Sequence, residues 1–290
     1  MSRTMQLFYQ NGILPVVVID DADKAVPLAQ ALLRGGISTI EITLRTDAGI
    51  KSIERIHREV PQMHVGAGTV ISCEKAEQAV QAGAQFIISP GLNLPVIQWC
   101  REREIPVFPG VATPSEVESA LNLGLSELKF FPAEAAGGVS MLRSFASPYS
   151  MVQFLPTGGI GLENMMDYLS LPNVRACGGS WLCPSNLIEQ EQFERIEKLA
   201  REAITKLHGF SLSEVEFCCK TAMEWEKMEI LSSFSNFQFS RYKGEKTYIK
   251  ITVNDVERAK AFLEYRGFSF LADQNKTEMT DFTLCLEQKI

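Results

Sequence analysis

A single lysine stands among apolar residues in the stretch LSELKFFPAEAAGG, residues 125–138. The segment ELKFFP is typical of a buried strand, and an ammonium group buried without a partner is costly. Lys129 is therefore either a structural charge, paired or reaching solvent from an edge strand, or a reactive group. A desolvated amine loses its proton more easily, and a free amine attacks carbonyl carbons to form a Schiff base. The residues around Lys129 leave both alternatives open.

A second pair of charged residues lies in TIEITLRTDAG, residues 39–49. Side chains alternate along a strand, so Glu41, Thr43 and Arg45 share one face and the aliphatic residues between them share the other. Inside a barrel, Glu41 and Arg45 either neutralise each other or act as a general base and a carboxylate clamp. The pair alone favours neither alternative.

Two glycine-rich turns, PTGGIG (156–161) and CGGSW (177–181), each follow a strand-like run. Glycine pairs mark tight turns, but backbone N–H groups in such turns also bind phosphate. Barrels frequently use the loops after their seventh and eighth strands for this purpose, so the presence of both turns favours a phosphate site. A third motif, VGAGTV, contains Thr69, which we expect to supply a polar contact at the rim.

The elements that must position these residues form a regular pattern of eight strand-like runs separated by amphipathic helical segments. The runs cover residues 13–19, 39–44, 64–69, 86–90, 107–112, 127–132, 153–158 and 174–180. Eight such units over roughly 200 residues predict parallel strands in a (β/α)8 TIM barrel. The alternative is a doubly wound sheet, but that fold usually has fewer strands, and no GxGxxG motif follows the first run. Polar and glycine residues collect at the carboxyl ends of the runs, where barrels carry their active sites.

Helix signals support this pattern. Ser72 is a predicted N-cap, and Thr113 with Glu116 forms a predicted capping box that has Pro114 at the first helical position. Residues 185–209, SNLIEQEQFERIEKLAREAITKLHG, are predicted to form one long amphipathic helix.

The pattern changes after about residue 185, so we place the barrel in residues 1–207 and a small α+β domain in residues 208–290. The second region contains two similar strand–turn–helix segments that start about 33 residues apart, which is weak evidence for duplication. The final segment, TDFTLCLEQKI, resembles a strand without a closing partner, which indicates a truncated chain or an abbreviated second domain.

Composition narrows the classes of function. The 290-residue chain carries a net charge of −7, which argues against broad nucleic-acid or anionic-membrane binding but not against an anionic substrate. Its seven cysteines include no CxxC pair and suit a reduced compartment. We expect a cytoplasmic protein, because no signal-peptide pattern is visible and the apolar run at residues 13–19 is too short to span a membrane. The three histidines lack metal-ligand spacing, so we expect no metal cofactor.

Eight motifs, in this order, resemble the 2-keto-3-deoxy-6-phosphogluconate (KDPG) / 4-hydroxy-2-oxoglutarate (KHG) aldolase family. They cover about residues 5–205 and are GILPVVVI, EITLRT, GAGTV, FIISPG, PVFPGVATPSE, LKFFPAEAAGG, FLPTGGI and CGGSWL. The resemblance implies a metal-free class I aldolase that is a homotrimer. It implies cleavage of KDPG, a small phosphorylated keto acid, to pyruvate and glyceraldehyde 3-phosphate. A related activity, cleavage of KHG to pyruvate and glyoxylate, is the alternative.

The resemblance also implies roles for individual residues. The lysine of LKFFP forms the Schiff base in that family, which implies this role for Lys129. The glutamate of EITLRT is the family's proton shuttle, which implies this role for Glu41. The arginine of the same motif and the threonine of GAGT hold the pyruvate moiety, which implies Arg45 and Thr69.

The pocket wall and the phosphate contacts are implied in the same way. Pro90 and Phe131 would line the pocket. Thr157 would touch the substrate hydroxyls, and its polar side chain favours the gluconate epimer over the galactonate epimer. The implied phosphate contacts are Gly158, Gly159, Gly179 and Ser180. A different class of function, a catalytically idle barrel that binds or assembles partners, is disfavoured by the intact set of lysine, glutamate and arginine.

The C-terminal region has a resemblance of its own. YIKITVNDVERAKAFLEYRGFSF is similar to βαβββ modules of the glyoxalase/bleomycin-resistance (vicinal oxygen chelate) superfamily. The metal histidine of that superfamily would fall near Tyr248, so the resemblance implies that this ligand is missing. We therefore interpret residues 208–290 as a non-metal structural or oligomerisation appendage.

Overall fold

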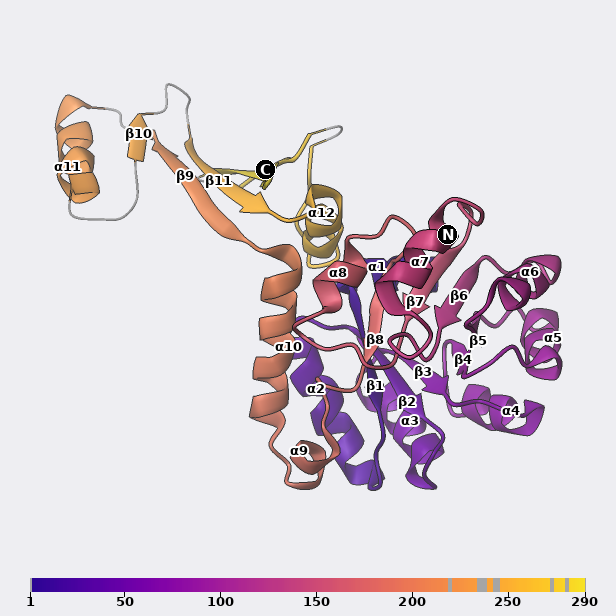
Figure 1. The fold of residues 1–290 in the computed structure, drawn as a ribbon. Coiled ribbons are helices and arrows are strands. Elements are labelled where there is room, and N and C mark those ends of the chain that lie inside the picture. The colour runs from indigo at the N-terminus through magenta and orange to yellow at the C-terminus, as the bar shows by residue number, and fades with distance from the viewer. Residues whose placement is uncertain are drawn as a thin grey trace. The chain divides into compact units, whose positions relative to one another are not determined.

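The computed structural model describes residues 2–218, 221–233, 239–241, 246–271, 274–279 and 282–289. The chain divides into two compact units, Met1–Ile204 and Thr205–Ile290. Figure 1 shows the amino-terminal unit as strands surrounded by helices and the carboxyl-terminal unit as a separate sheet with its own helices.

The amino-terminal unit is a barrel of parallel strands in the order β7-β6-β5-β4-β3-β2-β1-β8. Two isolated parallel bridges, Phe154 to Val174 and Thr157 to Gly178, join β7 to the β8 region and close the ring. This arrangement confirms the predicted (β/α)8 barrel and excludes the doubly wound sheet. The strands are β1 (Ile13–Val17), β2 (Thr39–Thr43), β3 (His64–Gly68), β4 (Ile87–Ser89), β5 (Val107–Val111), β6 (Glu127–Phe130), β7 (Gln153–Pro156) and β8 (Cys177–Gly179).

Helices follow the strands around the barrel (Figure 1). The predicted capping box is present, because Thr113 Oγ1 accepts from the N–H of Glu116 and the Glu116 carboxylate accepts from the N–H of Thr113. Ser72 likewise caps its helix by accepting from the N–H of Lys75. The helices are α1 (Arg3–Asn11), α2 (Ala25–Arg34) after a short 3-10 turn (Ala22–Lys24), α3 (Ala48–Glu59), α4 (Cys73–Gln81), α5 (Leu94–Glu102), α6 (Pro114–Asn122), α7 (Gly138–Ala146), α8 (Met165–Leu169), α9 (Ser185–Glu189) and α10 (Phe193–His208).

Helix α1 is an element that the sequence patterns did not predict. Its Phe8 is fully buried, with ring centroids 5.1 Å from Phe86 and 5.2 Å from Phe108. Phe86 directly precedes β4, and Phe108 lies near the start of β5, so α1 covers the amino-terminal end of the barrel. The opposite end, where the strands finish, is left for the loops that carry the candidate site.

The single long helix predicted for residues 185–209 is wrong, because the structure divides it into α9 and α10. Glu191 adopts a left-handed φ of 56°. The N–H of Gln192 then donates to the carbonyl of Leu187, and the N–H of Glu191 donates to the carbonyl of Ile188. These two bonds form a Schellman C-cap, which usually has glycine at the left-handed position. A glutamate there gave no sequence signal for a helix end.

The carboxyl-terminal unit has a mixed sheet in the order β10-β9-β11-β13-β12. The central strand β11 is antiparallel to β9 and parallel to β13, and β10 is parallel to β9. Both predicted strand–helix segments are present, the first as β9 followed by α11 and the second as β11 followed by α12. The expectation that the final segment lacks a partner is wrong, because β13 pairs with both β11 and β12. The elements are β9 (Ser211–Phe217), α11 (Ala222–Ser233), β10 (Phe239–Arg241), β11 (Thr247–Val253), α12 (Val256–Glu264), β12 (Lys276–Glu278) and β13 (Phe282–Gln288).

An unpaired histidine is buried in the carboxyl-terminal unit. His208 is 1% exposed, and its ring centroid lies 5.1 Å from that of Phe210 and 4.2 Å from that of Phe262. Neither ring nitrogen has a hydrogen-bond partner among the described residues. Burial, followed by the nearby charges of Arg258 and Arg266, lowers the pKa of His208 to about 3.

We therefore expect this unit to become less stable as the pH is lowered. His208 takes up a proton near pH 6.5 in the unfolded chain but only near pH 3 in the folded unit, so a fall in pH between these values favours the unfolded state. His208→Phe should remove this part of the pH dependence, on the order of 1–3 kcal/mol at pH 4. Hydrogen exchange of peptides from residues 205–218, compared between protein and variant at pH 7 and pH 4, measures it. The same pH response in both proteins would contradict the assignment.

Candidate active site

Lys129 and Glu41 meet inside the barrel. Lys129 lies on β6 and Glu41 on β2, and their Nζ and Oε1 atoms are 3.5 Å apart in an ion pair. The side chains are 6% and 1% exposed, so both charges are almost entirely shielded from bulk water. Strand β6 lies between β5 and β7, so Lys129 is not an edge-strand charge. The pairing that the sequence left open for Glu41 is therefore with Lys129, while Arg45 has a different partner.

Glycine on the neighbouring strand makes room for this pair. A Cβ atom at Gly68, on β3, would lie 2.0 Å from Glu41 Oε1. Any side chain at this position would force the carboxylate away from its present place. The GAGT motif predicted a contact only for its threonine, and the role of its second glycine was missed. The signal was present, because a glycine inside a strand often marks a close approach of another group.

An aromatic ring lies beside the lysine. The Nζ atom of Lys129 is 5.2 Å from the centroid of the Phe131 ring. Phe130 is fully buried among other aromatic side chains, with ring centroids 6.2 Å from Phe145 and 6.4 Å from Phe154. Adjacent residues of this segment therefore face opposite sides, so Lys129 and Phe131, two positions apart, lie together. The ring gives the lysine an apolar neighbour on one side.

Arg45 and Thr69 are brought together at the ends of β2 and β3. Arg45 Nε donates to Thr69 Oγ1 over 3.1 Å, and Arg45 is exposed. Thr69 has a φ of 58°, which is a rare and strained value for a β-branched residue. Such strain concentrates at functional sites, where the surrounding structure imposes it. Both side chains lie at the carboxyl ends of their strands and are available to an anionic group there.

Pro90 directly follows β4, at the same end of the barrel as Arg45 and Thr69. Its carbonyl oxygen would lie 2.1 Å from a Cβ atom at Gly110, so the glycine on β5 allows a close approach. Gly110 is the register partner of Lys129 on β6. The segment after β4 is thus one strand away from the strand that carries the lysine. Pro90 itself is partly buried.

The two glycine-rich turns lie side by side. The bridge between Thr157 and Gly178 aligns the end of β7 with β8. Thr157 is 6% exposed, and a Cβ atom at Gly178 would lie 2.3 Å from its Oγ1. Gly158 and Gly159 have φ values of 104° and 78°, which glycine adopts without strain. The structure therefore juxtaposes the loops that the sequence assigned to phosphate.

The second of these turns is covered on one side by an aromatic ring. Trp181 packs directly on Gly179, because a Cβ atom there would overlap its indole. Ser180, next in the chain, is exposed.

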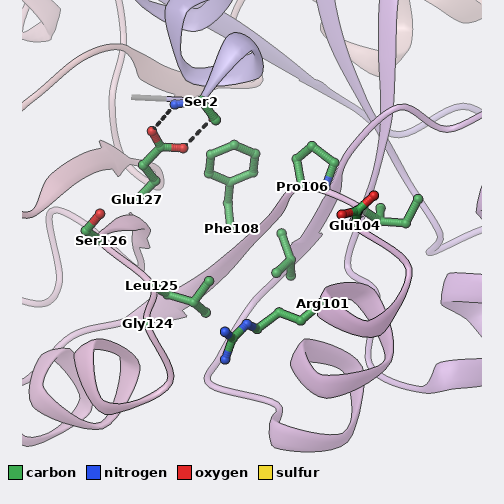
Figure 2. A pocket seen from close by; sticks show the side chains of 11 residues that line it. Ser2, Arg101, Glu104, Pro106, Phe108, Gly124, Leu125, Ser126 and Glu127 are labelled. Atoms are coloured by element: carbon green, nitrogen blue, oxygen red, sulfur yellow. Dashed lines mark hydrogen bonds between the residues drawn. The ribbon is translucent and has the colours of Figure 1, made fainter.

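A separate pocket lies at the opposite, amino-terminal end of the barrel (Figure 2). It has a volume of about 450 Å³ and is formed around the residues that precede and begin β5 and β6. Its Glu127 carboxylate accepts from the backbone N–H and the hydroxyl of Ser2. None of the predicted site residues lines this pocket, so it is distinct from the Lys129 region.

Other chemical groups are less suited to a site. Within the described part of the chain, no cluster of three or more histidine, cysteine, aspartate or glutamate side chains is arranged to hold a metal ion. Burial raises the pKa of the Cys183 thiol, which disfavours its thiolate. None of the helices in the described segments is long and apolar enough to cross a membrane.

An amine held beside a carboxylate inside a closed barrel can form an imine with a carbonyl substrate. Residues 5–199 match the family model described as "KDPG and KHG aldolase". The KHG/KDPG aldolase of Escherichia coli K12 is 47% identical over 192 residues, which are 66% of this chain and 90% of the relative. The 2-dehydro-3-deoxy-phosphogluconate aldolase of Dickeya dadantii is 46% identical over 199 residues, 69% of this chain and 93% of the relative.

A solved structure is also similar. The KDPG aldolase of Legionella pneumophila, with pyruvate captured at low pH as a covalent carbinolamine intermediate, has a TM-score of 0.68 and 40% identity. The alignment covers 70% of this chain and 98% of that one. The chain therefore belongs to the KDPG and KHG aldolase family. Residues 200–290 lie beyond the family match.

The role of Gly68 is testable through stability. Gly68→Ala should destabilise the barrel by on the order of 1–3 kcal/mol, because the new methyl group displaces the Glu41 carboxylate. Gly91→Ala is the matched control, since a Cβ atom there meets nothing within 4 Å. Urea denaturation of both variants measures the difference. Equal stabilities would show that Gly68 is not needed to seat Glu41.

Proposed function

We propose that this chain is a class I aldolase that cleaves KDPG to pyruvate and glyceraldehyde 3-phosphate. The observation that carries the proposal is the buried pair of Lys129 and Glu41 inside the barrel of a member of this family. The similar Legionella protein, captured with pyruvate as a covalent carbinolamine, supports the same chemistry here.

The first half of the reaction uses the lysine. Glu41 takes the extra proton of the Lys129 ammonium, and the free amine attacks the keto carbon at C2. Glu41 then returns that proton to the hydroxyl of the carbinolamine, which leaves as water and gives an iminium ion. Arg45 and Thr69 hold the neighbouring carboxylate, and Pro90 and Phe131 line the space around the keto acid. The cationic nitrogen then serves as an electron sink, so the reaction needs no metal for charge stabilisation.

The second half uses the carboxylate. Glu41, directly or through a water molecule, takes the proton of the C4 hydroxyl. The bond between C3 and C4 breaks, its electrons move toward the iminium nitrogen, and glyceraldehyde 3-phosphate leaves. The enamine is protonated at C3, and hydrolysis of the iminium releases pyruvate and the free lysine.

The remaining substrate atoms reach the glycine-rich turns. Thr157 contacts the substrate hydroxyls and favours the gluconate epimer. The phosphate lies on backbone groups of the two turns. We assign it to Gly158, Gly159, Gly179 and Ser180.

KHG is the second candidate substrate, because the similar protein of Escherichia coli is named for both compounds. Steady-state rates with KDPG and with KHG, followed by the pyruvate released, distinguish the two. A higher kcat/KM with KDPG supports the proposal. A higher value with KHG makes the second activity the main one, and no cleavage of either substrate would show that the barrel is idle.

The carboxyl-terminal residues are assigned no part in the reaction. We infer that residues 1–207 are the aldolase and that residues 208–290 are a non-metal structural or oligomerisation appendage. A cytoplasmic homotrimer is the assembly we propose. Sedimentation of the full chain tests the trimer directly.

Variants of the central pair test the mechanism. Lys129→Met should abolish turnover, because the variant keeps an apolar side chain of similar length but lacks the amine that forms the imine. Glu41→Gln should lower kcat by about 10²–10⁴-fold, the usual contribution of a general base. Lys198→Met, on an exposed face of α10, is the control and should keep full activity. Full kcat in Glu41→Gln would show that another group moves the proton.

A further inference from the structure

The turn after β7 presents backbone N–H groups without acceptors. Within the described part of the chain, the N–H groups of Gly159 and Ile160 have no hydrogen-bond partner. Successive N–H groups of this kind form concave anion sites. Two glycines make such a turn adaptable, however, and ordering a glycine-rich backbone is entropically costly. Something must hold the turn in the conformation that binds an anion.

Asn164 brackets this turn. Its Oδ1 accepts from the N–H of Gly161 over 2.8 Å, and its Nδ2 donates to the carbonyl of Gly159 over 3.1 Å. The two bonds satisfy the groups on either side of Ile160. The side-chain amide of Asn164 therefore holds Gly159 and Gly161 in place, while the N–H groups of Gly159 and Ile160 remain free.

The other side of the turn is held by the backbone after β6. The N–H of Ala133 donates to the carbonyl of Thr157 over 2.8 Å, and the N–H of Glu134 donates to the carbonyl of Gly158 over 3.1 Å. The carbonyl groups of the turn thus face protein donors. This leaves the N–H groups of Gly159 and Ile160 for a ligand.

We propose that Asn164 is a positioning residue for the substrate phosphate, acting through the N–H groups of Gly159 and Ile160. This inference rests on the proposed function, since it assumes a phosphorylated substrate. The glycine pattern predicted the phosphate-binding turn but not the Asn164 side chain that holds it.

The proposal predicts a selective kinetic effect. The phosphate does not change during cleavage, and a contact to it that is equally strong in the ground state and the transition state is uniform binding. Loss of such uniform binding raises KM and leaves kcat unchanged. Steps that involve only the pyruvate half should not respond at all.

Asn164→Ala is the test variant, and Asn122→Ala, at the exposed end of α6, is the matched control. Each is assayed for KDPG cleavage, for KHG cleavage, and for exchange of the methyl protons of pyruvate in deuterium oxide. Exchange needs the imine and the base but no phosphate. Asn164→Ala should raise KM for KDPG by about tenfold or more, as expected for two lost hydrogen bonds, with kcat within twofold. KHG cleavage and exchange should match the control.

Three results would overturn the inference. An unchanged KM for KDPG would show that the turn does not need Asn164. Equal losses with KDPG, KHG and pyruvate exchange would make Asn164 a general structural residue. If the unaltered protein shows neither exchange nor cleavage, the proposed function fails and this inference fails with it. If the unaltered protein is active, either of the first two results overturns the role of Asn164 alone and leaves the proposed function standing.

Discussion

The buried ion pair of Lys129 and Glu41 is the interaction on which the candidate site depends. Burial of two charges costs on the order of several kcal/mol per ion, and their attraction offsets this only in good geometry. At 3.5 Å the pair is long, and Oε2 of Glu41 has no hydrogen-bond partner among the described residues. Replacement of a buried ion pair by apolar side chains of similar size is often neutral or stabilising. The pair is therefore better explained by chemistry than by stability.

The barrel supplies what the pair requires. Parallel strands bring residues far apart in the sequence to one end, where the ends of β2, β3, β4 and β6 contribute Arg45, Thr69, Pro90 and Phe131. Glycines on β3 and β5 leave space for neighbouring groups, as Gly68 does for Glu41 and Gly110 for the Pro90 carbonyl. At the other end, α1 covers the core. One end of the barrel is thus packed for stability, and the other holds the polar and strained groups.

Much of this could be predicted from the sequence, because strand alternation and repeated β/α units determine which residues face inward. The position of Lys129 beside Phe131 and the juxtaposition of the two glycine turns follow from those patterns. The break between α9 and α10 could not be predicted, since Glu191 occupies a position where glycine is expected. The glycine inside β3 marks a close approach, but its partner Glu41 lies on another strand, which a local pattern does not identify. The contacts of Asn164 are local, to residues three and five positions away, but they depend on the backbone conformation of the turn, which the residue types alone do not determine. The pairing of β13 also depends on distant strands.

The most direct test of the central claim is borohydride reduction of the full chain in the presence of pyruvate, followed by intact mass and peptide mapping. The account predicts one reduced pyruvyl group for each chain, attached to Lys129. An adduct on another lysine, or none in protein shown to be folded, would contradict it. In that case Lys129 would be a structural charge, and the buried pair would need a different explanation.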